Sequence, residues 1–248
     1  MAKTLGKRDR NIFEPGAEEP FKLSRSKLEL FLECPKCFYQ DRRLGIGRPE
    51  GFPFTLNNAV DHLLKKEFDI YRANGEPHPL MRKYKIDAVP FTHDDLDRWR
   101  ANFTGVQYLH PKTNFIITGA VDDVWINVKK ELIVVDYKAT STTKEITLDE
   151  EYRSGYKRQI EIYQWLLRRN DFKVSDTGYF VYVNGKTDAV AFDGRLEFDV
   201  QIISYTGNDG WVEGTVIEAH KCLMNAKIPP AKPDCRYCAY TSEVKKVG

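Results

Sequence analysis

A short apolar run that ends in charged side chains is the feature that most restricts how this chain can fold. The run Leu132–Val135 is followed at once by Asp136, Tyr137 and Lys138. Four consecutive branched apolar residues predict a buried β-strand. Because the side chains of a strand alternate between its two faces, Asp136 and Lys138 are expected to point to the same face at the strand end.

The segment that precedes this strand predicts a partner for it. Residues 114–127 and 131–140 are both rich in β-branched side chains, and the stretch Val128–Lys130 between them has the length of a tight turn. We therefore expect a β-hairpin. Its first arm contains the segment Gly119–Asp122, which would bring the carboxylate of Asp122 close to that of Asp136.

Two carboxylates on rigid β-structure can hold a hard divalent cation. A lysine beside them can offset the charge that develops on a phosphate group during hydrolysis. Asp122 has Asp123 next to it, and one of the two could instead cap a turn; strand alternation favours Asp122 as the inward residue. The pattern as a whole is typical of an enzyme that cuts phosphodiester bonds.

Periodicity predicts the other elements. A helix is expected to follow Ser24 as its N-cap, and the apolar spacing of Leu56, Val60 and Leu64 indicates a second helix over about 55–72 that contains His62. Further helices are expected over about 94–103, 152–169 and 211–225, and further strands over 178–183 and 196–205. Residues 74–113 carry a weaker signal and are expected as a helical insertion.

Composition favours a globular protein with a modest overall charge. The 248 residues are 42% hydrophobic and 12% aromatic, which is enough for a substantial core. The 38 basic and 36 acidic residues leave a formal charge of +2, so any affinity for nucleic acid must come from local basic patches. Residues 1–20 predict a flexible tail, and 21–248 a single domain. The tail contains no apolar stretch typical of a signal peptide or membrane span, so we expect a cytoplasmic protein without a membrane partner.

Four of the five cysteines form two C-x-x-C pairs at opposite ends of the chain. The pairs are Cys34 with Cys37 and Cys235 with Cys238. In a reducing compartment such spacing indicates metal binding before disulfides. A shared metal would connect the N- and C-terminal segments and restrict the unfolded chain over a long loop, so the role is expected to be structural, with residues 234–240 completing the site.

Four motifs occur along the chain in the order helix, strand, strand, helix. They are His62, the motif ending in Asp122, the Asp136–Lys138 motif, and Gln159 with Tyr163. This resembles the PD-(D/E)XK nuclease superfamily, and within it the RecB-like branch that includes CRISPR-associated adaptation exonucleases and the nuclease domains of helicase-nucleases. The resemblance covers about 23–240. It implies an α/β fold with a restriction-endonuclease-like core, in which helices flank a mixed central sheet.

The resemblance also implies a role for each residue. Asp122, Asp136 and the backbone carbonyl of Tyr137 would bind Mg²⁺ or Mn²⁺, with His62 as a further ligand that favours Mn²⁺. Lys138 would orient or activate the attacking water. Gln159 and Tyr163 would complete the site, and the two lie one helical turn apart on one face of their helix.

For the cysteines the resemblance implies a [4Fe-4S] cluster, because several RecB-like nucleases hold one with a Cys-Pro segment near the N-terminus and three cysteines near the C-terminus. Cys34, Cys235 and Cys238 match that pattern, but the last cysteine of the family is absent and Cys37 would have to replace it. This arrangement is equally typical of a tetrahedral zinc site. We favour the cluster and keep zinc as the alternative.

The function implied is a metal-dependent DNA nuclease, expected to act as an exonuclease on single-stranded DNA or DNA ends in repair, recombination or CRISPR adaptation. No helicase P-loop motif occurs, so a helicase or adaptation protein is the expected partner for unwinding. One alternative is a non-catalytic DNA-end-binding subunit of a larger complex. Another is a different metal-dependent hydrolase, which the lack of H-E-x-x-H and G-x-S-x-G motifs disfavours.

Overall fold

The computed structural model describes residues 7–49, 51, 55–150 and 153–247. The chain divides into two compact units, each built from segments that are distant in sequence. The first unit comprises Met1–Phe52, Gln107–Thr118 and Gly210–Gly248, and the second comprises Pro53–Val106 and Gly119–Asp209. Among the described residues, no helix combines the length and the apolar character that a membrane crossing requires.

The first unit combines a small sheet with four helices. Its strands are β1 (Phe21–Ser24), β3 (Val106–His110) and β4 (Phe115–Gly119), and its helices are α1 (Arg25–Glu33), α2 (Pro35–Arg43), α7 (Val212–Met224) and α8 (Arg236–Val247). The sheet order is β1-β4-β3, with β1 parallel to β4. Part of the segment expected as a tail contributes to this unit, because Phe13 is buried against the rings of Phe21 and Phe115.

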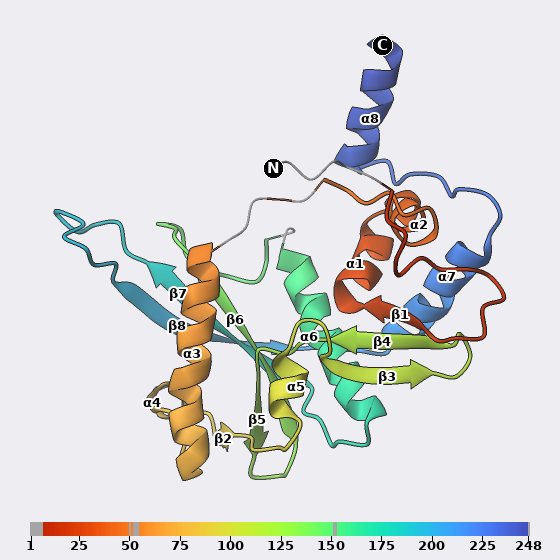
Figure 1. Ribbon diagram of the computed structural model, residues 1–248. Coiled ribbons are helices and arrows are strands. Elements are labelled where there is room, and N and C mark those ends of the chain that lie inside the picture. The colour runs from red at the N-terminus through yellow and green to blue at the C-terminus, as the bar shows by residue number, and fades with distance from the viewer. Residues whose placement is uncertain (1–6, 50, 52–54, 151–152, 248) are drawn as a thin grey trace. The chain divides into compact units, whose positions relative to one another are not determined.

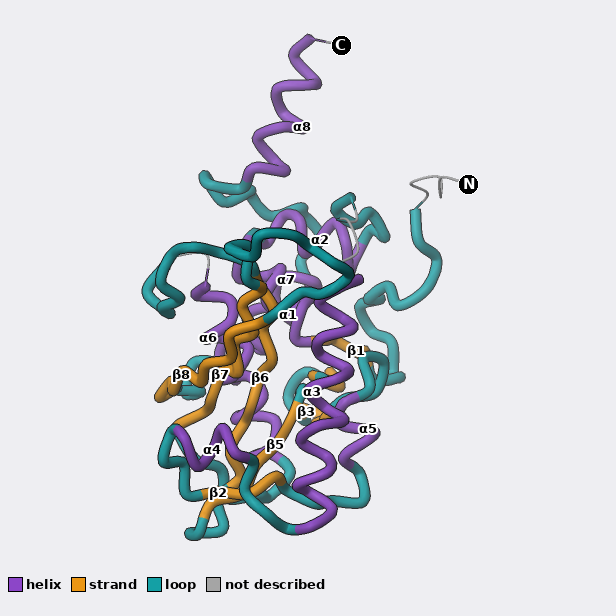
Figure 2. The backbone as a smooth tube through the Cα atoms, turned by 90° about the vertical axis from the view of Figure 1, so that its left-hand side faces the viewer, coloured by secondary structure: helices purple, strands orange, loops and turns teal. Residues whose placement is uncertain are grey.

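The second unit is built on a five-stranded mixed sheet of order β2-β5-β6-β7-β8 (Figures 1 and 2). Its strands are β2 (Ala88–Pro90), β5 (Asp123–Asn127), β6 (Leu132–Thr140), β7 (Thr177–Gly185) and β8 (Phe198–Thr206), and its helices are α3 (Thr55–Asn74), α4 (Pro79–Lys83), α5 (Leu96–Arg100) and α6 (Ser154–Arg169). β6 and β7 are parallel, and the other pairs are antiparallel. The predicted α/β class with a mixed sheet flanked by helices is confirmed.

The alternation of side chains along β6 separates two layers. Ile133, Val135 and Tyr137 point into a core that also contains Leu64 and Phe68 of α3. Asp136 points to the opposite face, where it meets α6. Burial of the apolar α3 face therefore fixes which residues of β6 face α6, since a shift of one residue would exchange the two sets.

The predicted strand over 114–127 is interrupted. β4 ends at Gly119 and belongs to the small sheet, whereas β5 begins at Asp123 in the large one. Between them the backbone N–H of Val121 donates to the carbonyl of Trp99 rather than to a neighbouring strand. Gly119 packs against the ring of Tyr163, where a Cβ atom would come within 2.5 Å of a ring carbon. Sequence periodicity predicted one strand because every residue across the break is compatible with extended backbone.

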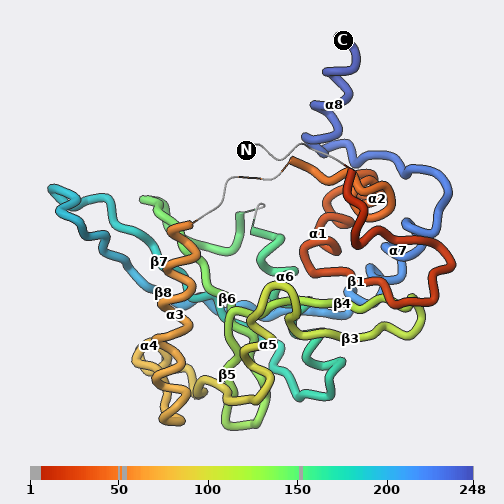
Figure 3. Tube along the Cα trace, in the orientation of Figure 1, coloured from red at the N-terminus to blue at the C-terminus, as the bar shows by residue number. Residues whose placement is uncertain are grey.

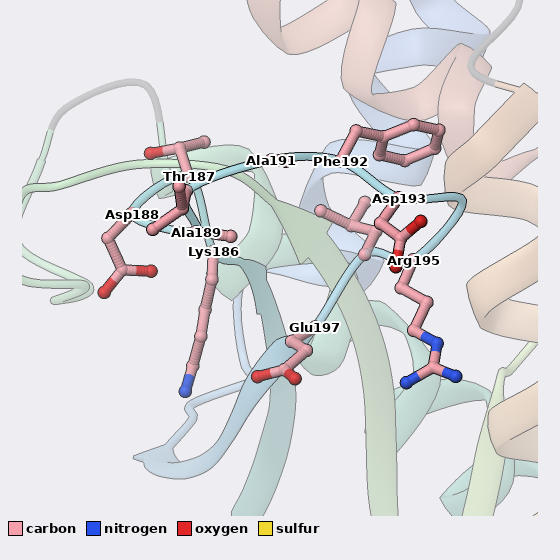
Figure 4. A pocket seen from close by; sticks show the side chains of 11 residues that line it. Lys186, Thr187, Asp188, Ala189, Ala191, Phe192, Asp193, Arg195 and Glu197 are labelled. Atoms are coloured by element: carbon pink, nitrogen blue, oxygen red, sulfur yellow. The ribbon is translucent and has the colours of Figure 1, made fainter.

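Two other regions contain structure that the sequence did not predict. The expected insertion over 74–113 contains the short helices α4 and α5, but it also supplies strands β2 and β3. The connection between β7 and β8 forms an extended arm (Figure 3). Within this arm, side chains from 186–197 line a hollow of about 670 Å³ (Figure 4), and none of the predicted site residues lines it.

Candidate active site and cysteine centre

The two predicted carboxylates meet where β6 loses one of its neighbours. Val135 is paired with Asp123 of β5, but from Asp136 onward β6 is paired only with β7 among the described residues. The backbone N–H of Tyr137 therefore has no partner in β5, and it donates instead to Oδ2 of Asp122 at 3.0 Å. Asp122 thus occupies the open edge of β6, beside Asp136.

Each oxygen of the Asp136 carboxylate is held by one neighbouring side chain. Its carboxylate is fully buried, Oδ1 accepts a hydrogen bond of 2.7 Å from Nε2 of Gln159, and Oδ2 forms an ion pair with Nζ of Lys138. The same Gln159 amide lies 3.1 Å from the hydroxyl of Tyr163. The structure therefore brings together Asp122, Asp136, Lys138, Gln159 and Tyr163.

The electrostatics of this cluster fit a divalent cation. The pKa of Asp136 is raised to about 7, mainly by burial; Lys138 opposes this shift and the neighbouring Asp122 adds to it. Burial alone would lower the pKa of Lys138, but the two carboxylates raise it. Oδ2 of Asp136 makes no hydrogen bond among the described residues. Two neighbouring carboxylates, one of them fully buried, form an oxygen donor set that suits Mg²⁺ or Mn²⁺, which binds through one or two carboxylates and keeps several waters.

Helix α3 contributes two charged residues that sequence reasoning missed. Nζ of Lys65 lies 2.8 Å from Oδ2 of Asp61 and 3.3 Å from Oδ1 of Asp122. The predicted ligand His62 is exposed, and no hydrogen bond or ion pair joins it to another described residue, so its role stays a prediction. The i,i+4 spacing of Asp61 and Lys65 was visible in the sequence, but the same spacing occurs on solvated helix faces.

Tyr156 of α6 is a second residue that the sequence did not single out. Nζ of Lys138 lies 4.6 Å from the centre of the Tyr156 ring, a distance typical of a cation–π contact. Tyr182 of β7 is the register partner of Lys138, and its buried hydroxyl makes no hydrogen bond among the described residues. The ammonium group of Lys138 is held between the carboxylate of Asp136 and the ring of Tyr156.

Asp123 lies on the face of the sheet opposite to Asp136, together with the side chain of Tyr137. It is fully buried and accepts hydrogen bonds from Arg72, from Nη2 of Arg100 at 2.7 Å and from the hydroxyl of Tyr137 at 2.9 Å. Tyr137 is thus held at both ends, because its backbone N–H bonds Asp122 and its hydroxyl bonds Asp123. This fixes the strand that carries Asp136 and Lys138 on either side of Tyr137.

A comparison with protein families gives a match over residues 53–242, to the PD-(D/E)XK nuclease superfamily. The chain belongs to this superfamily. PD-(D/E)XK nucleases are metal-dependent enzymes, in agreement with the carboxylate pair at the edge of β6. No curated protein sequence matches the chain significantly. Among solved structures, the one described as "Crystal structure of SSO0001" aligns with 15% identity and a TM-score of 0.40, covering 91% of this chain and 86% of that chain.

This PD-(D/E)XK chain also has a second candidate metal centre, formed by the four predicted cysteines in the first unit. Cys34 and Cys37 flank the first turn of α2, and Cys235 and Cys238 lie at the start of α8. Their sulfur atoms all lie within 4.8 Å of one another, and among the described residues no other group of three or more such ligands is this compact. The predicted connection between N- and C-terminal segments is confirmed.

The separations between the sulfur atoms can be compared with those that different metal centres require. Sγ of Cys37 lies 3.6 Å from Sγ of Cys235 and from Sγ of Cys238, and the Cys34–Cys238 separation is 3.8 Å. Four thiolates at ~2.3 Å from one zinc ion lie about 3.8 Å apart at the corners of a tetrahedron. A [4Fe-4S] cluster places iron and sulfide atoms between its thiolates and requires wider separations. The donor set therefore fits a single tetrahedral ion.

Arg48 borders the cysteine centre. Its Nη2 donates to Sγ of Cys235 at 3.7 Å, its guanidinium carbon lies 4.4 Å from the centre of the Tyr237 ring, and Glu33 forms an ion pair with it. Burial alone would raise the pKa of Cys34, but hydrogen bonds from backbone N–H groups of Cys37 and Lys232 lower it to about 7. The backbone hydrogen bonds therefore favour the thiolate form of Cys34, which is the form that binds metal.

Proposed function

We propose that this chain is a divalent-metal-dependent deoxyribonuclease that hydrolyses phosphodiester bonds. The observation that carries the proposal is the buried Asp136, which lies beside Asp122 and forms an ion pair with Lys138 on the same strand. A purely structural site would gain nothing from a second carboxylate beside a fully buried one, because burial and the neighbouring negative charge both disfavour ionisation of Asp136.

Asp122 and Asp136, with the backbone carbonyl of Tyr137, would hold Mg²⁺ or Mn²⁺, with His62 as a further proposed ligand. When bound, the cation supplies polarisation of the attacking water and stabilisation of negative charge on the phosphate oxygens. Gln159 keeps Asp136 in place through its amide, and Tyr163 in turn lies against that amide. Lys138 is positioned to orient the water and to offset charge on the phosphate.

The finer part of the proposal is an exonuclease of the RecB-like branch, acting on single-stranded DNA or DNA ends. Repair, recombination and CRISPR adaptation are the proposed contexts, with a helicase or an adaptation protein as partner and the cytoplasm as the location. The support is the order of His62, Asp122, Asp136–Lys138 and Gln159 with Tyr163 along the chain. For the cysteine centre we propose a structural zinc ion, because the sulfur separations match a tetrahedron around one metal.

The test is a time course with end-labelled linear single-stranded DNA, linear duplex and circular DNA, in Mg²⁺ and in Mn²⁺. We expect cleavage of linear substrates only, with Asp136→Ala and Lys138→Ala each reducing the rate by roughly 10²-fold or more. Lys129→Ala is the matched control, because Lys129 is exposed at the turn of the same hairpin. Undiminished cleavage by the first two variants would remove these residues from the chemistry. DNA-end binding by the wild type without cleavage would favour the non-catalytic alternative.

A further inference from the structure

The ammonium group of Lys65 lies where a cation is expected beside Asp122. It is 2.8 Å from Oδ2 of Asp61 and 3.3 Å from Oδ1 of Asp122, and the Lys65 side chain is only 19% exposed. Asp61 and Lys65 are one helical turn apart on α3, so the helix itself presents this pair to the carboxylate. Neither residue is part of the donor set assigned above.

Both oxygens of Asp122 are engaged in this arrangement. Oδ2 accepts from the backbone N–H of Tyr137, which the strand geometry of β6 fixes in place. Among the hydrogen bonds of the described residues, Oδ1 is engaged by Lys65, whose four-carbon stem can rotate away. A divalent cation bound to Oδ1 would lie within a few ångströms of this ammonium group, and the two positive charges would repel each other.

The charges of the cluster allow such an exchange. Three carboxylates face two ammonium groups, which gives −3 + 2 = −1 when all are ionised (Asp61, Asp122 and Asp136 against Lys65 and Lys138). A divalent cation changes this sum to +1, and one phosphodiester group returns it to zero. A cation on Oδ1 of Asp122 would displace the ammonium group of Lys65. The substrate phosphate would then replace Asp122 as a partner of this ammonium group.

We propose that Lys65 is the resident counter-ion of the metal-free site and becomes a phosphate-positioning residue when a divalent cation takes its place at Asp122. The phosphate-positioning half of this proposal rests on the proposed nuclease function, whereas the counter-ion half does not. If Lys65 formed only a structural ion pair between α3 and the site, its replacement would weaken metal binding. A resident counter-ion predicts the opposite, because its removal leaves Asp61 and Asp122 without a positive charge between them.

The experiment measures Mn²⁺ binding to the full chain by titration calorimetry without DNA. We expect Lys65→Met to bind Mn²⁺ about fivefold more tightly or better than the wild type, and Lys65→Arg to remain close to the wild type. Lys66→Met is the matched control, because Lys66 is the next residue on α3, is exposed and forms no hydrogen bond or ion pair among the described residues. Lys65→Gln replaces Lys65→Met if the latter does not fold.

A second measurement tests the phosphate contact. Binding of a phosphorothioate oligonucleotide in saturating Mn²⁺ should weaken about fivefold or more in Lys65→Met and little in Lys66→Met. Equal or weaker Mn²⁺ binding by both neutral Lys65 variants overturns the counter-ion role. Unchanged oligonucleotide affinity overturns the phosphate role. Tighter Mn²⁺ binding together with a wild type that cleaves no DNA supports the counter-ion and rejects the nuclease, so the two failures are distinguishable.

Discussion

The side-chain amide of Gln159 donates a hydrogen bond of 2.7 Å to Oδ1 of Asp136. The carboxylate is thereby held from α6 while Lys138 engages its other oxygen from the same strand. Because Asp136 is fully buried, the orientation of its carboxylate depends on these two contacts and not on water. Gln159 is therefore a positioning residue in the proposed nuclease, and its effect should be separable from that of the carboxylate itself.

Replacement of Gln159 by glutamate should shift the pH dependence of DNA cleavage. A carboxylate next to Oδ1 raises the pKa of Asp136 above its value of about 7, so the ionised form that binds metal is reached only at higher pH. We expect the rate in Mn²⁺ to rise toward alkaline pH in Gln159→Glu and to be about tenfold lower at pH 7. Gln159→Met removes the hydrogen bond without adding charge, so it should lower the rate without that alkaline shift. Identical pH profiles for both variants would contradict the positioning role.

The raised pKa of Asp136 also predicts how the metal-free protein responds to pH. In the unfolded chain this carboxyl group ionises near 3.8, and in the folded protein near 7, so unfolding releases a proton between these values. The stability contributed by this group therefore falls as pH rises from about 4 to about 7 and is constant above that range. The free energy of unfolding of Asp136→Asn minus that of the wild type should increase by up to about 1.4 kcal/mol per pH unit within this window.

The measurement is urea unfolding of both proteins in buffers freed of Mg²⁺ and Mn²⁺ by a chelating resin, without soluble chelator that would remove the cysteine-bound metal. The sign of the pH trend is the critical result, because it does not depend on the constant cost of leaving Lys138 without its partner. A difference that is independent of pH between 4 and 8 would show that Asp136 ionises normally in the folded state.

Replacement of Asp123 should destabilise the second unit without removing any residue that is proposed to bind the divalent cation. Its buried carboxylate is bonded by Arg72, Arg100 and Tyr137, so Asp123→Ala leaves two buried guanidinium groups without this partner. We expect a loss of about 3–5 kcal/mol in the free energy of unfolding. Asp95→Ala is the control, because it breaks an exposed ion pair with Arg98 and should cost about 1 kcal/mol or less. Chemical denaturation followed by tryptophan fluorescence compares the two, and equal losses would contradict a role for burial.

The elements that the sequence predicted well are those with a long periodic signal. α3 was expected over about 55–72 and spans Thr55–Asn74, and α6 was expected over about 152–169 and spans Ser154–Arg169. Their apolar faces are wide enough that helical periodicity dominates the local preferences. β6 was equally clear, since a run of branched apolar residues has few alternatives to a buried strand.

What the sequence did not reveal depends on contacts between distant segments. The break after Gly119 coincides with the packing of this residue against Tyr163, and the edge of β6 opens because β5 begins only at Asp123. Asp61 and Lys65 reach Asp122 because α3 lies along the sheet, which no spacing rule describes. Short elements such as α2 and β1 were missed because they contain too few residues to show a period.

The cysteine centre should contain zinc and stabilise the first unit. We expect elemental analysis of the purified protein to give about one zinc ion per chain and a colourless sample. Cys37→Ser should lose the metal and lower the melting temperature, since the ion connects α2 to the start of α8. A brown protein with about four iron atoms per chain after anaerobic purification would instead confirm the [4Fe-4S] cluster that the cysteine spacing first suggested.

Arg48 should slow the release of metal from this centre. Four thiolates around one divalent ion carry a net charge of −2, and the guanidinium of Arg48 donates to Cys235 while Tyr237 and Glu33 hold it in place. Arg48→Met removes both the charge and the donor, so metal transfer to a colorimetric chelator should be about 10- to 100-fold faster. Arg48→Lys should lie in between, because an ammonium group keeps the charge but cannot stack and donate in the same geometry. Arg236→Met is the matched control, since Arg236 is exposed and adjacent in sequence to Cys235. Equal acceleration by Arg236→Met would mean that general charge, and not the contact of Arg48 with sulfur, retains the metal.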